Sequence, residues 1–128
     1  MATITSITGK DHYRTEVRTS AHQLVVDEPL GYGGKALGPA PDELLASALG
    51  SCTSITLRMY ADRKGWPLES VQTTVTLSRE SGRTEMTMDI VLDGPLDQEQ
   101  RERLLDIAHK CPVHVTLNQA VTIHTVLK

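Results

Sequence analysis

Two stretches near the middle of the chain alternate strictly between apolar and polar residues. The positions on one side are Val71, Thr73, Val75 and Leu77 in the first stretch and Met86, Met88, Ile90 and Leu92 in the second. Alternation with a period of two is typical of a strand that buries one face. The turn residues Ser81-Gly82-Arg83 lie between the two stretches, so the pattern predicts an antiparallel hairpin.

The N-terminal third contains three shorter segments rich in β-forming residues. They cover residues 3–8, 13–19 and 24–26, and the turn residues Gly9-Lys10-Asp11 separate the first two. The glycines and prolines of residues 31–41 suit neither the interior of a strand nor a helix. This part of the chain therefore predicts three strands followed by a connector.

A long helix is predicted over Pro41–Lys64. Proline suits the first turn of a helix, and the next two residues, Asp42 and Glu43, favour the positive end of the helix dipole. Gly65 directly after Lys64 predicts the C-terminal end. Residues 44–55 carry no charge, and a helix that is apolar all round is expected to be buried.

A second helix is predicted after Asp97, which suits the N-cap position. Leu104, Ile107 and Ala108 recur at helical spacing, and Pro112 predicts the end of the helix. Residues 121–127 predict a final strand. The element order is then βββ-α-ββ-α-β, in which strands and helices are segregated, and this predicts an α+β fold on a mostly antiparallel sheet.

Length and charge limit the possible functions. The 128 residues fit a single domain, 1–128, and a net charge of −3 argues against general binding of nucleic acid. No apolar run approaches the roughly 20 residues of a membrane span, and no signal peptide is visible at the N-terminus, so a cytoplasmic location is expected. The chain has no phenylalanine, which suggests that a second subunit contributes apolar cover.

Two cysteines, Cys52 and Cys111, are the main candidates for chemistry. In a cytoplasmic protein, cysteines are more often catalytic or metal-binding than part of a static disulfide. Cys52 lies in the apolar helix without a cation among its helical neighbours, so it is either a core thiol or a nucleophile activated from elsewhere in the fold or by a second chain. Cys111 lies at the end of the second predicted helix, where it either packs as a core residue or is placed to react with another thiol.

The acids at the start of the long helix have two interpretations. Asp42 and Glu43 either offset the helix dipole or orient an arginine near the thiol. Asp42 is ten residues before Cys52, about 15 Å along a helix, and Glu43 lies nearly on the opposite face from Cys52. Neither carboxylate can therefore contact the thiol directly.

Metal binding is a rival chemistry for the same region. Four residues could act as soft ligands, namely Cys52, His109, Cys111 and His114. Their spacing does not match a zinc signature, in which two close ligands are paired with two more close ligands. The other histidines, His12, His22 and His124, are expected on strand faces or at the surface, so no metal or cofactor is predicted.

Two motifs resemble those of a known family. Residues 38–53, GPAPDELLASALGSCT, are similar to the central-helix motif of the OsmC and organic hydroperoxide resistance (Ohr) family. Residues 111–114, CPVH, look like the second-cysteine motif of that family. The separation of the two motifs also agrees, so the resemblance covers nearly the whole chain.

The resemblance implies an intertwined homodimer with curved antiparallel sheets and a buried central helix. It also implies a thiol peroxidase in which Cys52 attacks an apolar alkyl or fatty-acid hydroperoxide and becomes a sulfenic acid. Cys111 then resolves the sulfenic acid to a disulfide. A dithiol, which in some members is a lipoylated protein, reduces the disulfide. The helix-start glutamate of the family falls on Asp42, next to Glu43. The activating arginine has no direct counterpart, and Lys10, Arg14 or Arg18 is expected to substitute for it.

A second hypothesis keeps the same scaffold without catalysis. The missing arginine favours a non-enzymatic protein that binds an apolar small molecule or senses redox state. The presence of both cysteines favours the peroxidase.

Overall fold

The computed structural model describes all residues 1–128. None of its helices is long and apolar enough to cross a membrane. The chain forms two compact units, Met1–Leu45 and Ala46–Lys128, and each unit has its own antiparallel sheet. The single domain expected from the chain length stays a prediction.

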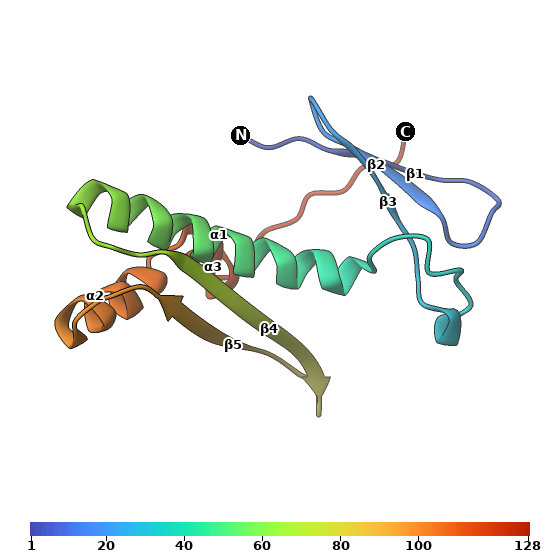
Figure 1. The fold of residues 1–128 in the computed structure, drawn as a ribbon. Coiled ribbons are helices and arrows are strands. Elements are labelled where there is room, and N and C mark those ends of the chain that lie inside the picture. Colours follow the sequence, from blue (N-terminus) through green and yellow to red (C-terminus); the bar gives the residue numbers. More distant parts are fainter. The chain divides into compact units, whose positions relative to one another are not determined.

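The first unit contains a three-stranded sheet in the order β1-β2-β3 (Figure 1). Its strands are β1 (Thr5–Thr8), β2 (Thr15–Arg18) and β3 (Gln23–Val26), and both pairings are antiparallel. The three predicted strands are confirmed, with ends that differ from the prediction by one or two residues. A short 3-10 helix, Leu30–Tyr32, lies in the predicted connector.

One buried carboxylate organises the connector of the first unit. Asp27 is only 2% exposed and accepts four backbone hydrogen bonds. Oδ1 accepts from the amides of Tyr13 at 3.0 Å and Glu28 at 2.8 Å, and Oδ2 accepts from those of Lys35 and Leu37, both at 3.2 Å. Burial acts to raise the pKa of Asp27, but the four N–H donors outweigh it and hold the pKa below its usual value.

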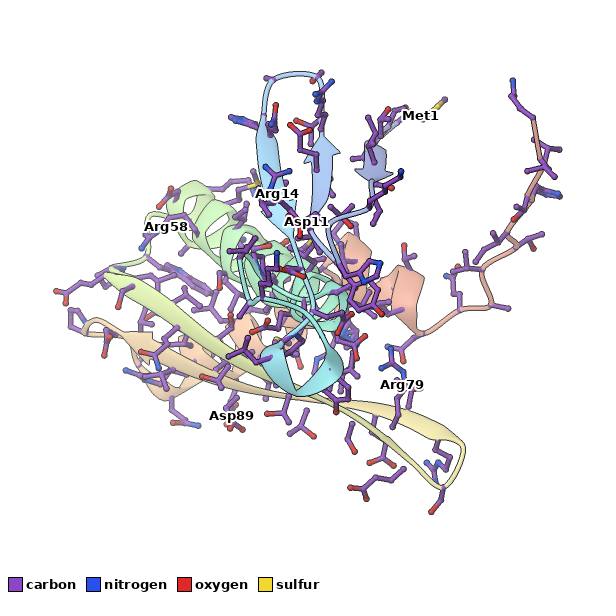
Figure 2. All side chains as sticks on the ribbon, turned by 90° about the vertical axis from the view of Figure 1, so that its right-hand side faces the viewer. Met1, Asp11, Arg14, Arg58, Arg79 and Asp89 are labelled. Atoms are coloured by element: carbon purple, nitrogen blue, oxygen red, sulfur yellow. The ribbon has the colours of Figure 1, made fainter.

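The second unit contains the predicted hairpin, formed by β4 (Ser70–Glu80) and β5 (Arg83–Asp93). Ser81 and Gly82 join the strands with positive φ angles of 54° and 73°, the combination that a two-residue type I′ turn requires. The predicted inward positions are partly buried, and the outer face carries polar residues such as Asp89 (Figure 2). The alternating pattern is therefore confirmed.

The long helix α1 covers Pro41–Lys64, as predicted. At its start, Glu43 Oε1 accepts the Ala40 N–H at 2.9 Å, which is one half of a capping box. At its end, Gly65 has a φ of 69° and donates its N–H to the carbonyl of Asp62 at 3.1 Å. Local end signals therefore fix both ends of α1.

The helix α2 covers Gln98–Ala108 and begins with a capping box. Asp97 accepts the Gln100 N–H at 2.8 Å, and the Gln100 side chain accepts the Asp97 N–H at 3.0 Å. In the second unit, α1 and α2 pack with the hairpin around one core. Its buried members are Leu57, Tyr60, Ala61, Leu68, Leu96, Leu104, Ile107 and Ala108.

Two predictions about the C-terminal part of the chain are wrong. Pro112 does not only follow the second helix but begins a third, α3 (Pro112–Leu117), because proline fits the first position of a helix. Residues 121–127 form no strand and are exposed, since no neighbouring strand offers them hydrogen bonds in the single chain. The observed order is therefore βββ-α-ββ-α-α, still α+β with antiparallel sheets.

Burial of α1 is complete along one face only. Thr53 and Leu57 have no exposed surface, whereas Ile55 and Met59 are 54% and 67% exposed. The covered face packs on the hairpin and α2, and Ile55 and Met59 lie on the other face.

Candidate active site

The two cysteines are brought into contact. Cys52 lies in the middle of α1, and Cys111 lies at the N-cap position of α3, just after α2. Both are free thiols, and their side chains lie close enough for each to shift the pKa of the other. The sequence predicted two candidate thiols, and the packing of α2 and α3 against α1 places them together.

The rotation of α1 on the hairpin is fixed next to this pair. Thr73 Oγ1 of β4 donates to the Gly50 carbonyl at 3.1 Å and lies 3.2 Å from Ser54 Oγ. One turn further along, Arg58 donates from Nη1 to the Leu68 carbonyl at 2.7 Å and from Nη2 to the Glu69 carbonyl at 3.0 Å (Figure 2). These contacts hold α1 against β4 and the two residues before it, on both sides of Cys52.

The two sulfur atoms differ in accessibility. Cys52 is partly exposed, whereas Cys111 has no exposed surface. A small molecule from solvent can therefore reach Cys52 directly, and only a group already inside the protein can reach Cys111.

Cys111 has several hydrogen-bond donors around it. The backbone N–H groups of Val113 and His114 lower the pKa of its thiol, because the first amides of a helix have no partner within the helix. The hydroxyl of Thr53 on α1 and the thiol of Cys52 also lower it. Helix α3 thus contributes the amides, and α1 contributes the side chains.

The pKa values of the two thiols move in opposite directions. Burial raises the pKa of Cys52, the hydrogen bond with Cys111 raises it further, and the Val113 N–H and the Thr56 hydroxyl only partly offset this. Burial also acts to raise the pKa of Cys111, but the Cys52 thiol and the surrounding N–H and O–H donors prevail and lower it. In the reduced protein, Cys111 therefore holds the negative charge of the pair more readily than Cys52.

The other predicted site residues have separate positions. Glu43 takes part in capping α1, and Asp42 lies beside it in the first turn. Arg14 is exposed and directly precedes β2 in the first unit (Figure 2), and Arg18, at the end of β2, pairs with Glu16 at 3.5 Å. The main groups that shift the pKa of Cys52 are a thiol, a hydroxyl and a backbone amide, and none is a cation.

No group of three or more His, Cys, Asp or Glu side chains is arranged to hold a metal ion. The rings of His109 and His114 pack edge to face with centroids 5.3 Å apart, and His109 Nδ1 bonds to the Leu105 carbonyl at 2.9 Å. The histidines beside Cys111 are therefore engaged with each other and with the backbone.

Sequence reasoning missed two hydroxyl groups at the site. Thr53 contacts Cys111, and Thr56 contacts Cys52. Both are polar residues within the most apolar helix of the chain, and this was the signal that could have singled them out.

Three solved structures illustrate how far this fold is shared. An OsmC-like protein from Mycoplasma pneumoniae has a TM-score of 0.80 at 22% identity, over 91% of this chain and 86% of that one. The organic hydroperoxide resistance protein OsmC from Legionella pneumophila has a TM-score of 0.67 at 22% identity, over 92% and 89% of the two chains. The organic hydroperoxide resistance protein OhrB of Bacillus subtilis has a TM-score of 0.63 at 19% identity, over 92% and 90%.

Sequence comparison places the chain in a family. No curated protein sequence matches it. The family model described as OsmC-like protein matches residues 33–126, a span that contains α1, the hairpin and both cysteines. With the shared fold, this match shows that the chain belongs to the OsmC-like protein family.

Proposed function

We propose that this protein is a cysteine-based peroxidase that reduces organic hydroperoxides to alcohols. The observation that carries the proposal is the contact between an accessible thiol, Cys52, and a fully buried one, Cys111. Two of the similar structures are named organic hydroperoxide resistance proteins, which supports the same chemistry.

Cys52 is the proposed peroxidatic residue because it is the thiol that a solvent-borne peroxide can reach. Its proton passes to the Cys111 thiolate, which acts as the local base. The Cys52 thiolate then attacks the outer oxygen of the hydroperoxide, so that an S–O bond forms and the O–O bond breaks. The alkoxide takes the proton from Cys111 and leaves as the alcohol, so that Cys52 becomes a sulfenic acid and Cys111 is again a thiolate.

Cys111 is the proposed resolving residue. Its thiolate attacks the sulfur of the Cys52 sulfenic acid, so that the S–S bond forms, the S–O bond breaks, and the hydroxide leaves and takes up a proton from solvent. An external dithiol, such as a lipoylated protein, then restores both thiols by exchange. In this proposal Arg14 supplies the positive charge that favours the Cys52 thiolate, and Asp42 or Glu43 orients that arginine.

A homodimer in the cytoplasm is part of the proposal. Ile55 and Met59 lie exposed on α1, and the apolar residues among 121–127 have no strand partner in the single chain. A second copy would cover these side chains and bury apolar surface. Sedimentation at micromolar concentration should show a dimer, and a stable monomer would contradict this part.

Counting thiols tests the peroxidase directly, because the chain has only these two cysteines. One equivalent of cumene hydroperoxide should remove both thiols of the reduced protein and give a Cys52–Cys111 disulfide in mass spectrometry. Cys52→Ser should keep its Cys111 thiol, and Cys111→Ser should stop after one turnover at the sulfenic acid. Two free thiols after prolonged exposure would refute the proposal.

One observation favours a binding protein as the second candidate. The pKa of Cys52 is raised, and its main neighbours include no cation that would activate it. An apolar cavity of about 230 Å³, lined by Leu57, Ile90, Leu92, Leu105 and Arg101, offers room for a small apolar ligand. Binding of cumyl alcohol by a protein whose two thiols survive cumene hydroperoxide would favour this function over catalysis.

A further inference from the structure

Thr53 has a buried hydroxyl group without a hydrogen-bond partner. The residue has no exposed surface, and neither an oxygen, a nitrogen nor a sulfur atom forms a hydrogen bond with its Oγ1. In a helix, a threonine or serine hydroxyl usually bonds to the carbonyl three or four residues earlier. Ser51 on the same helix does so, at 2.7 Å from the Ser47 carbonyl. The Thr53 hydroxyl makes no such bond.

The hydroxyl lies close enough to the fully buried Cys111 to lower the pKa of that thiol. A buried hydroxyl without a partner is costly, so a core position of this kind is normally occupied by an apolar residue of the same shape, such as valine. A sulfur atom that carries negative charge is the acceptor that would satisfy this donor. A hydroxyl at position 53 therefore costs stability while it has no partner, and it gains a hydrogen bond when Cys111 carries negative charge.

We propose that Thr53 is a positioning residue of the thiol pair, whose hydroxyl donates a hydrogen bond to the Cys111 sulfur and holds it as a thiolate facing Cys52. This role rests on the proposed peroxidase function, since it concerns the resolving step. The Cys111 thiolate forms the S–S bond with the Cys52 sulfenic acid, and hydroxide leaves from Cys52. Thr53 exchanges no proton or electron in the step and acts only through Cys111.

The charged and titratable groups around Cys111 come from three elements. Cys52 lies on α1, His109 follows α2 and His114 lies in α3. All of these remain in a protein changed at Thr53 alone, so differences between variants at this position report on the hydroxyl.

Two substitutions separate the hydroxyl from the shape of the side chain. Thr53→Val keeps the shape and removes the donor, whereas Thr53→Ser keeps the donor and removes a methyl group. With one equivalent of cumene hydroperoxide at neutral pH, we expect Thr53→Val to close the disulfide about tenfold more slowly, the size expected for one lost hydrogen bond to a charged acceptor. Its pH profile should shift to higher pH, and Thr53→Ser should restore the wild-type profile.

Thiolate absorbance at 240 nm, followed against pH without peroxide, gives a second measurement that does not need peroxidase activity. We expect Thr53→Val to form its first thiolate at higher pH than the wild type and Thr53→Ser. If peroxide leaves the thiols intact but this shift is seen, the peroxidase proposal fails and the role of Thr53 stands. If all three proteins share one titration curve, the role of Thr53 is overturned. It is also overturned if Thr53→Val resists urea less well than Thr53→Ser but closes its disulfide at the wild-type rate, because the hydroxyl is then only structural.

Discussion

The packing of α2 against α1 should determine how firmly Cys111 is held. Leu104 on α2 has no exposed surface and belongs to the core that α1, α2 and the hairpin share. The adjacent Leu105 is 54% exposed. Leu104→Ala and Leu105→Ala remove the same atoms from the same helix, so they form a matched pair in which only the burial differs.

The expected magnitudes follow from this burial. Truncation of a fully buried leucine to alanine costs about 2–5 kcal/mol, because apolar burial is lost and a cavity remains. For a side chain that is half exposed, the loss is about 1 kcal/mol. With roughly 4 °C of melting temperature per kcal/mol for a chain of this size, Leu104→Ala should melt about 10 °C lower than the wild type and Leu105→Ala about 4 °C lower.

Urea unfolding measured by circular dichroism gives the free energy of unfolding of each variant. A second measurement, disulfide formation after one equivalent of cumene hydroperoxide, should be slower in Leu104→Ala because a loosened α2 no longer fixes the chain that leads to Cys111. If Leu104→Ala costs no more stability than Leu105→Ala, the shared core does not hold α2 on α1, and the reasoning is refuted.

Two further predictions concern the backbone of each unit. Because its pKa is lowered on folding, the Asp27 carboxylate contributes stability above its unfolded pKa of about 3.9 and loses it as the pH falls through the lower folded value. Wild-type protein should therefore lose stability to urea below about pH 4 more steeply than Asp27→Asn, and parallel curves would contradict the assigned role. Gly94 has a φ of 133°, and a Cβ there would lie 2.2 Å from the Pro67 carbonyl oxygen, so Gly94→Ala should destabilise by at least about 1–3 kcal/mol. Gly9→Ala, where a Cβ meets no atom within 4 Å, is the thermal-melting control, and equal melting temperatures would show that the strain is absent.

Elements with strong local signals were predicted closely. The bounds of α1 agree because Pro41, the acids after it and Gly65 act through neighbouring backbone atoms. The hairpin and the cap at Asp97 agree for the same reason. Each of these features depends on residues within a few positions along the chain, so a single sequence contains the whole interaction.

The C-terminal elements were predicted wrongly because their signals are ambiguous or depend on distant partners. Pro112 suits the end of one helix and the start of another equally well, and only the chain after it shows that α3 forms. The alternation in residues 121–127 favours a strand, but a strand needs a neighbour to accept its hydrogen bonds, and no part of the single chain takes that position.

The sequence by itself determined the element types as far as α2, the family motifs and the two thiols as the candidates for chemistry. Only the tertiary structure decided that Cys52 and Cys111 lie close together, that Cys111 is the buried member, and that the unpartnered hydroxyl of Thr53 lies near it. The physical reason is distance along the chain. Caps and alternation act between near neighbours, whereas contact, burial and the pKa of a thiol depend on groups that α1, α2 and α3 bring together only when they pack.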